Sequence, residues 1–426
     1  MDEQPPTLTT PKKEHWLNST VLGAGITSAL GDIAHESTTT VLPGFLAALG
    51  LPSAPAILGL IEGLSDATSS FTKLGAGYYS DRIGHRKPVV LLGYALTAGA
   101  QALYALAFGW PLILFGRLLA WFGRGIRGPL RDAILAESIT EQTRGRAFGF
   151  HRAADTLGAV IGPLLGAGLL SLLESHATGA DATVPFRIVF WVSLIPGFLS
   201  VVSFAFLVHE QERPPNHALK FWTTVRQLPK SFRRYLLAVG VFGMGDFAPT
   251  LLILAATQLL TPEWGLVHAA QIAAALYLWR NVVYAAASFP IGALGDRIGH
   301  RPVLAAGYAL GALSAALMMY AFLVDETNQI GIIIAAFTIA GLYIAIEDTL
   351  ESAMTADLVP PEIRGIGYGT LGTVNGIGDF FASAATGLLW SSISASCAFG
   401  VAAVFMTFGT VLMWIGWRQN EERLTL

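Results

Sequence analysis

The sequence contains little cysteine and few charged residues, and each shortage excludes certain kinds of protein. Cys397 is the single cysteine in 426 residues, which excludes an internal disulfide framework and any cysteine-based metal site. Charged residues make up only 13% of the chain and the formal net charge is −3, so no basic excess indicates nucleic acid binding. There is no G-x-x-x-x-G-K-[ST] loop and no polar segment long enough for a nucleotide domain, which argues against an ATP-driven pump. No nucleophile–base constellation can be assigned, so we do not expect an enzyme.

Long segments without charged residues are the most prominent feature of the sequence. Residues 89–116, 188–208, 302–323 and 380–417 carry no charged side chain, and the mean hydropathy is +0.55. A helix of about 20 apolar residues crosses a ~30 Å hydrocarbon layer. The sequence therefore predicts an all-α membrane protein with twelve transmembrane helices, at about 17–48, 53–78, 88–108, 111–138, 145–174, 185–208, 231–260, 267–293, 302–323, 328–358, 364–392 and 394–418.

Lysine and arginine fall mainly on one side of this topology. Of the 26, eighteen lie in the tails, in the loops that follow even-numbered helices or at the helix ends beside these loops, seven lie deeper within spans, and Arg187 lies at an opposite edge. Such an asymmetry places both termini in the cytoplasm of a protein that crosses the inner membrane many times. We expect a cytoplasmic N-terminal tail (1–16) without a secretory signal, a linker (209–230) and a C-terminal tail (419–426).

The chain contains an internal repeat of about 215 residues. The segment GYYSDRIGHR at 77–86 returns as GALGDRIGHR at 292–301, and Gly31-Asp32 aligns with Gly245-Asp246. At an offset of 220 residues, Arg144-Gly145 aligns with Arg364-Gly365. The repeat predicts two pseudo-symmetric six-helix bundles, 17–208 and 231–418, with parallel orientation, which is a transporter architecture.

The repeated loop resembles the signature of the major facilitator superfamily. The loop reads Gly77-x-x-x-Asp81-Arg82-x-Gly84-x-Arg86-Lys87 between the second and third helices, and a degraded copy follows the eighth. A second segment, GAVIGPLLG at 158–166, is similar to the helix-5 motif of the drug/proton antiporter branch. The family's arginine in the fourth helix corresponds to Arg117 or Arg124. The resemblance implies a monomeric transporter in which each bundle clamps and releases.

The residue types of the loop predict a latch. Glycines 77 and 84 permit a tight reversal, Asp81 can face the positive start of the helix near Arg364, and Arg82 and Arg86 can pair with carboxylates such as Glu137. The residues that we assign to gating are Gly77, Asp81, Arg82, Gly84, Arg86, Arg131, Glu137, Asp155, Gly158, Gly162, Pro163, Asp296 and Arg297. The alternative is that the charges only fix topology.

Charged residues within the predicted spans mark the candidate transport site, since each is costly to bury in a membrane. Asp32, His35 and Glu36 share one helix face, and we expect Asp32 and Glu36, with Glu62 and Asp66 next, to carry a coupling proton. The candidates for substrate binding are His35, Arg117, Arg124, Asp246, Arg280, Glu347 and Asp379. The alternative for any one of them is a fixed ion pair between helices, and His35 can also be an interior histidine without a titration role.

The sequence therefore predicts a secondary active transporter that couples export of a small organic compound to protons by alternating access. No cofactor beyond the proton, no resident metal and no nucleic acid partner is expected; the partners are the substrate and membrane lipid. A transition-metal or metal-chelate carrier is an alternative, because Asp32, His35 and Glu36 offer oxygen and nitrogen ligands. A symporter or uniporter for a small metabolite is another, and a receptor on a transporter scaffold is a third. Substrate charge and transport direction stay open at this point.

Overall fold

The computed structural model describes residues 16–49, 54–174, 183–211, 220–324 and 329–424. Within these ranges the chain is helical and has no β-strand, so the all-α prediction is confirmed. The helices are α1 (Ser19–Ala48), α2 (Ala54–Ile83), α3 (Lys87–Ala105), α4 (Trp110–Glu137), α5 (Arg144–Glu174), α6 (Val184–Leu207), α7 (Phe221–Gln227), α8 (Lys230–Gly243), α9 (Pro249–Ile298), α10 (His300–Ala321), α11 (Gln329–Leu358), α12 (Arg364–Ser392) and α13 (Ala395–Leu424).

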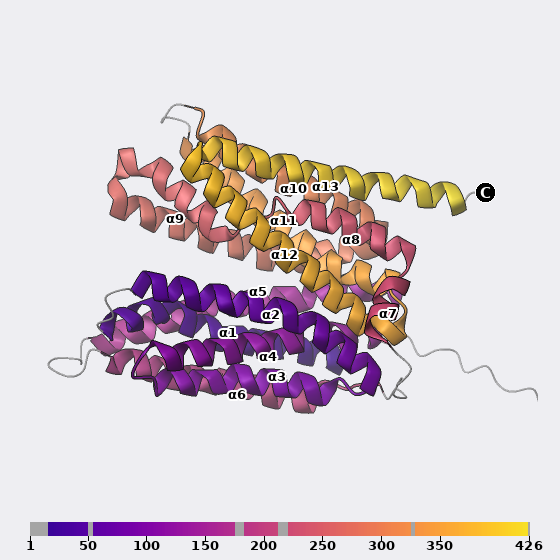
Figure 1. The fold of residues 1–426 in the computed structure, drawn as a ribbon, viewed down its shortest axis with the longest axis horizontal. Coiled ribbons are helices and arrows are strands. Elements are labelled where there is room, and N and C mark those ends of the chain that lie inside the picture. The colour runs from indigo at the N-terminus through magenta and orange to yellow at the C-terminus, as the bar shows by residue number, and fades with distance from the viewer. Residues whose placement is uncertain (1–15, 50–53, 175–182, 212–219, 325–328, 425–426) are drawn as a thin grey trace, which may run out of the picture.

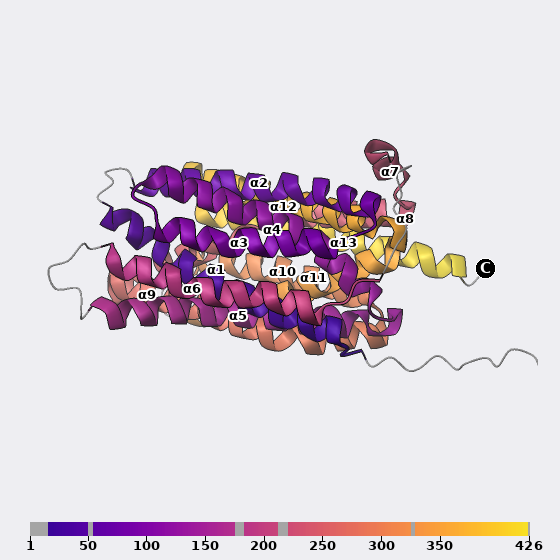
Figure 2. The same ribbon diagram turned by 90° about the horizontal axis from the view of Figure 1, so that it is seen from below.

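The helices form two bundles that follow one another along the chain. In Figure 1, α1–α6 lie together in the lower half and α8–α13 in the upper half. Each bundle has its own buried aromatic core, which includes Tyr104 and Phe190 in the first and Phe242 and Tyr308 in the second. The short helix α7 lies in the connection between the bundles and projects beside α8 in Figure 2. The two-bundle architecture predicted from the repeat is the one observed.

The second bundle differs from the prediction at its first two helices. The predicted helix 231–260 is interrupted at residues 244–248, and the predicted break at 261–266 is helical and belongs to α9. Leu252 and Arg280 nevertheless line one small cavity, although 28 residues of straight helix would separate them by about 42 Å. The α9 element must therefore reverse its direction between these residues, so it supplies two antiparallel arms. Asp246 consequently lies in the interruption and not within a helix as predicted.

The repeat extends to backbone conformation. Gly84 (φ 76°) and Gly299 (φ 98°) are the two described residues with positive φ, and they occupy equivalent positions of the repeated loop. Glycine adopts this region without steric penalty, so each can end a helix with an abrupt turn. The predicted role of Gly84 is confirmed. Gly77 lies within α2 and not in the reversal, so that part of the prediction is wrong.

The ends of the chain are described in part. Residues 1–15 of the predicted N-terminal tail lie outside the described ranges, but Trp16 is described and packs against Phe150 of α5 and Phe289 of α9. The predicted C-terminal tail begins at residue 419, beyond the last candidate membrane span, and α13 continues through it as far as Leu424.

Seven helical segments of the described part have the length and hydropathy needed to cross a membrane. They are Lys87–Ala105, Glu141–Leu173, Val184–Leu207, Ile272–Ile298, His300–Ala321, Gln329–Leu358 and Ala395–Ile415. Among the others, α4 carries four arginines and α8 has only 14 residues. The four arginines lower the hydropathy of α4, and α8 is too short to meet the length needed.

Candidate functional site

The first bundle reaches the second through Asp81. Its carboxylate accepts hydrogen bonds from the backbone N–H groups of Gly365 (3.2 Å) and Ile366 (2.8 Å) at the start of α12. The first N–H groups of a helix have no intrahelical partner and carry partial positive charge, which makes a carboxylate a favourable partner. The predicted contact of Asp81 with this helix is confirmed. We call the end of the molecule where this contact lies the loop end; it is on the right in Figure 1.

The second bundle returns the same contact through Asp296 near the end of α9. This carboxylate accepts hydrogen bonds from the N–H groups of Gly145 (2.7 Å) and Arg146 (3.0 Å) at the start of α5, and also from Nε of Arg146 (3.0 Å). We refer to Asp81 and Asp296, each with the helix start that it contacts, as the two interbundle caps. They connect positions that the repeat makes equivalent, so the latch is duplicated.

Glycines allow the helices to approach at both interbundle caps. A Cβ atom on Gly365 would lie 2.6 Å from Oδ1 of Asp81, and one on Gly77 would overlap the carbonyl of Gly365. At the second cap, a Cβ on Gly145 or on Gly292 would overlap the other residue's carbonyl. The spacing of aspartate and glycine in the repeated loop therefore has a packing reason that positive charge alone does not require.

A network of charges supports the first cap from within its own bundle. Arg86 forms ion pairs with Asp81 (2.6 Å) and with Glu137, so the predicted partnership with Glu137 is confirmed. Burial alone would lower the pKa of the Arg86 guanidinium, but Glu137 and Asp81 outweigh it and raise the pKa. Arg82 does not pair as predicted; it is exposed and donates to the hydroxyl of Tyr78 (3.2 Å).

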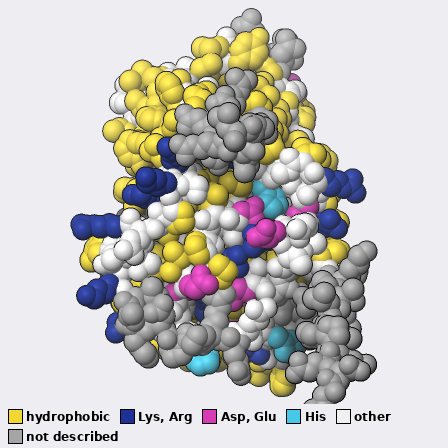
Figure 3. Space-filling view, turned by 90° about the vertical axis from the view of Figure 1, so that its right-hand side faces the viewer, with side chains coloured by type: hydrophobic (Ala, Val, Ile, Leu, Met, Phe, Trp, Pro, Cys, Tyr) yellow, Lys and Arg dark blue, Asp and Glu magenta, His cyan; other side chains and the backbone are white. Residues whose placement is uncertain are grey.

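A further ion pair crosses between the bundles at the loop end. Arg144 of α5 lies 2.5 Å from Asp357 of α11, whose other oxygen lies 2.7 Å from Nδ1 of His300. In Figure 3, which views this end, acidic and histidine side chains gather centrally and basic side chains lie around them. Arg297, predicted to act in gating, is exposed. The contacts of Asp81, Asp296 and Arg144 with the opposite bundle all lie at the loop end, so we describe this end as closed.

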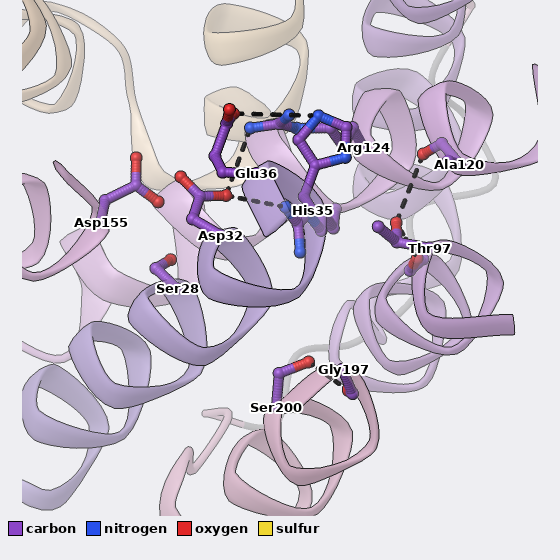
Figure 4. Close-up of polar contacts among 12 residues, drawn as sticks. Ser28, Asp32, His35, Glu36, Thr97, Ala120, Arg124, Asp155, Gly197 and Ser200 are labelled. Carbon is purple, nitrogen blue, oxygen red and sulfur yellow. Dashed lines mark hydrogen bonds and ion pairs between the residues drawn. The ribbon is translucent and has the colours of Figure 1, made fainter. Parts of the chain in front are cut away.

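The interior of the first bundle holds a carboxylate between arginines. Asp32 of α1 lies 3.3 Å from Nη2 of Arg124 and 3.8 Å from Nη2 of Arg127, both on α4. The Asp32 side chain is 6% exposed, whereas that of Arg124 is 30% exposed. Figure 4 shows Asp155 of α5 beside Asp32 and Glu36 of α1. Two guanidiniums supplied by α4 therefore surround the carboxylate of α1.

His35 and Arg117 lie on the other side of this group, against one indole. The His35 ring is 4.6 Å from the Trp121 ring, and the guanidinium of Arg117 is 3.8 Å from the centre of the same indole. Arg117 also donates to the hydroxyl of Thr39 (3.0 Å). Glu36 approaches His35 only to 4.0 Å, and its side chain is 29% exposed. The His35 ring thus packs against this indole at a tilt of 55° and lies 3.4 Å from the hydroxyl of Thr39, and Glu36 is more accessible than Asp32.

The helix-5 motif holds α1 in place. A Cβ on Gly162 would lie 2.7 Å from Cβ of Glu36, and one on Gly158 would overlap the carbonyl of Ala29. Pro163 lies inside α5 beside them. These residues, predicted to act in gating, lie at a helix contact within one bundle and set the position of Asp32 and Glu36.

Two other predicted gating residues form pairs inside the first bundle. Arg131 binds Asp132 (3.0 Å) and the hydroxyl of Ser28 (3.0 Å). Asp155 lies 3.5 Å from Arg152 on the same helix. Arg152 also reaches across to within 3.8 Å of Asp348.

The second bundle holds its carboxylates by neutral donors. Asp246 accepts a hydrogen bond from the hydroxyl of Tyr343 (2.8 Å). Glu351 accepts from the hydroxyl of Tyr308 and from Nδ2 of Asn375 (2.7 Å). Hydroxyls and amides stabilise a buried carboxylate without neutralising it. The first bundle therefore pairs Asp32 with guanidiniums, whereas the second bundle provides neutral donors to Asp246 and Glu351.

The remaining substrate candidates of the second bundle differ in their burial and in their contacts. Arg280 is buried and donates to Oδ1 of Asn281 (3.0 Å), and it lines a small cavity with Phe247 and Tyr343. Asp379 of α12 is exposed, and Glu347 of α11 is buried.

The side chains of Glu62 and Asp66 on α2 are outside the described residues, so their predicted role is not tested. No group of three His, Cys, Asp or Glu side chains within the described ranges is arranged to hold a metal ion. Asp32 lies beside two guanidiniums, and His35 lies against an indole.

Sequence reasoning missed the tyrosines and Asn375 that hold the second bundle's acids, and the bond between Arg144 and Asp357. The alignment of Arg144-Gly145 with Arg364-Gly365 was the available signal for the helix starts. No sequence signal joins Tyr308 to Glu351, because 43 residues separate them.

Comparison with known proteins agrees with this geometry. The family profile described as Major Facilitator Superfamily matches residues 21–261 and 235–425. An uncharacterized MFS-type transporter of Methanocaldococcus jannaschii is 30% identical over 377 residues, which cover 88% of this chain and 89% of that protein. The multidrug resistance protein MdtH of Escherichia coli is 33% identical over 117 residues, covering 28% and 29%. The crystal structure of the human organic anion transporter MFSD10 superposes with a TM-score of 0.72 at 17% identity, covering 93% of this chain and 99% of that one.

Proposed function

This chain belongs to the Major Facilitator Superfamily, and from that premise we propose that it exports a small organic compound in exchange for protons. It is a multi-pass membrane transporter of the alternating-access type, and it is not an enzyme. The proposal concerns the coupling ion, the direction and the residues that carry them.

The observation that carries the proposal is Asp32 between Arg124 and Arg127, with the more exposed Glu36 one turn further along α1. A carboxylate in such a place exchanges its guanidinium partner for a proton at a modest cost, because either one offsets its buried charge. Protonation of Asp32 releases Arg124, and loss of the proton restores the pair. One interior group can thereby bind and release a proton during the transport cycle.

The gating part of the proposal uses the two interbundle caps. When the bundles separate at the loop end, Asp81 and Asp296 lose their contacts with α12 and α5, and water solvates both partners. We assign the loop end to the cytoplasm, because lysine and arginine are concentrated in the loops and tails predicted for that side. The closed loop end then corresponds to a state open to the outside. We further propose that the transporter acts as a monomer in the inner membrane with both termini cytoplasmic.

The short match to the multidrug resistance protein MdtH supports export, and a symporter or uniporter for a small metabolite stays the second candidate. No cofactor other than the proton is part of the proposal. Glu62 and Asp66 stay secondary candidates for the proton site.

The test uses inside-out vesicles with an imposed pH gradient. We would add organic cations, organic anions, zwitterions and divalent metals in turn and record collapse of the gradient. We expect one organic class to collapse it with the native protein, and Asp32→Asn to abolish the effect. Glu141→Gln, whose side chain is 77% exposed, serves as the matched control and should behave as native. No response to any compound by folded protein, or a full response by Asp32→Asn, contradicts proton-coupled export as proposed.

A further inference from the structure

The interior of the second bundle carries a marked excess of negative charge. Five carboxylates lie within mutual electrostatic range there, namely Asp246, Glu347, Asp348, Glu351 and Asp379. Arg280 is the single arginine of this bundle within range of them, through Asp246. In an interior of low dielectric, such an excess is costly unless something positive offsets it.

The first bundle does not share this excess. Asp32 has Arg124 and Arg127 beside it, and Asp155 has Arg152. Within the described ranges, by contrast, Asp246, Glu347, Glu351 and Asp379 form no ion pair. Asp348 obtains its cation from Arg152 of the other bundle at 3.8 Å, and Lys73 of the other bundle lies within electrostatic range of Asp379.

Glu347 is the member of the group with a buried oxygen that accepts no hydrogen bond. Its side chain lies on α11, the residue is 7% exposed, and its Oε2 atom has no hydrogen-bond partner. Its carboxyl group lies within hydrogen-bonding reach of the Asp246 carboxyl, and the carboxylates of Glu351, Asp348 and Asp379 also repel a negative charge on it. A buried acceptor without a partner costs about 1–3 kcal/mol, so its persistence indicates a group that binds there for part of the cycle.

The neighbouring residues decide where that group binds. Arg280 lies on the Asp246 side and would repel a cation there. Asp379 is exposed, and the cation within its electrostatic range is Lys73 of the other bundle, so it is the accessible member of the group.

We propose that Glu347 and Asp379 bind the substrate and that the substrate is an organic monocation, such as a protonated amine. This inference rests on the proposed transport function and adds the substrate class. An organic anion would meet five carboxylates at this site. A metal ion would need converging ligands, and no such group occurs in the described ranges.

The test measures equilibrium binding to the purified full-length protein in detergent, at fixed pH and without a gradient. Tetraphenylphosphonium and tetraphenylborate form a pair of similar size and opposite charge, and benzylamine and benzoate form a smaller pair. We expect a cation of either pair to bind and its anionic counterpart to bind at least about tenfold more weakly. Glu347→Gln and Asp379→Asn should each raise the Kd of the cation at least about tenfold.

Glu351→Gln is the matched control, because Tyr308 and Asn375 already satisfy that carboxylate, and its Kd should stay within about twofold of native. Asp32→Asn should also keep cation binding, so loss of gradient collapse in that variant tests proton coupling separately. Tighter binding of an anion, no binding of either cation by folded protein, or an unchanged Kd in both Glu347→Gln and Asp379→Asn overturns the inference. Cation binding with unimpaired coupling in Asp32→Asn would overturn the proton site and leave the substrate class standing.

Discussion

The first interbundle cap makes a quantitative prediction for the access equilibrium. Asp81 contacts the second bundle only in the closed state, through the N–H groups of Gly365 (3.2 Å) and Ile366 (2.8 Å). Its pair with Arg86 lies within the first bundle and survives opening. The change Asp81→Asn should therefore act mainly on the free energy difference between the closed and the open loop end.

The magnitude follows from those two bonds. A hydrogen bond to a charged group contributes about 1.5–3 kcal/mol, and asparagine keeps one oxygen that can still accept one weaker bond. We take the loss as roughly one charge-assisted bond, or about 1.5–3 kcal/mol, which corresponds to a shift of about ten- to a hundredfold toward the open loop end. The double variant Asp81→Asn/Asp296→Asn should shift it further, since the second cap is lost as well.

Spin-label distances provide the assay. Labels on Glu141→Cys and Glu362→Cys, in a Cys397→Ser background, report across the loop end, because both native side chains are exposed and belong to different bundles. We expect the population at long distance to rise relative to that at short distance in Asp81→Asn.

The matched control for this experiment is Glu210→Gln. Glu210 also accepts two backbone N–H bonds, from Arg86 (2.5 Å) and Lys87 (3.0 Å), but within one bundle. It should leave the ratio of populations unchanged. An Asp81→Asn protein that is folded and keeps the native ratio within about twofold, or a Glu210→Gln protein that shifts it equally, would refute the reasoning.

Two further changes test packing. Gly145→Ala places a Cβ against the carbonyl of Gly292 and should raise the population with an open loop end in the same spin-label assay. Gly168→Ala is the control, because the space around its Cβ is open, and it should leave that population unchanged. Equal behaviour of the two variants would contradict the argument that the helices approach closely at Gly145. Phe242→Ala removes a fully buried ring stacked 3.8 Å from that of Tyr308 and should lower the free energy of unfolding by about 3–5 kcal/mol, measured as a lower midpoint of thermal unfolding in detergent. Phe206→Ala, at a side chain that is 77% exposed, should change the midpoint little. An unaltered midpoint in Phe242→Ala would show that the core repacks freely.

The sequence was most informative where local chemistry decides the outcome. The repeat placed Asp81 and Gly84 over Asp296 and Gly299, and the structure gives both glycines positive φ and both aspartates a helix start as partner. These features follow from short-range requirements, since a turn needs a residue without Cβ and a helix start attracts a carboxylate. They can therefore be read from spacing alone.

The prediction failed where packing against distant residues decides the outcome. Asp246 was expected within a helix, but the chain leaves the helix there, and the N–H of Ala248 bonds to the hydroxyl of Ser383, 135 residues away. The predicted break at 261–266 is helical, so α9 reverses without the interruption that its composition suggested. Helix propensity is a weak prior that tertiary contacts override.

The sequence by itself determined that the chain forms two bundles of apolar helices and that their charged turns are equivalent, because hydropathy and glycine spacing are local properties. Only the tertiary structure decided which interior charges have partners. Asp32 and Asp246 occupy equivalent positions of the repeat, yet one lies beside two guanidiniums and the other beside a tyrosine hydroxyl. That difference arises from the side chains that α4 and α11 bring to each site, and pairing across helices depends on distances in space that the order of residues along the chain does not contain.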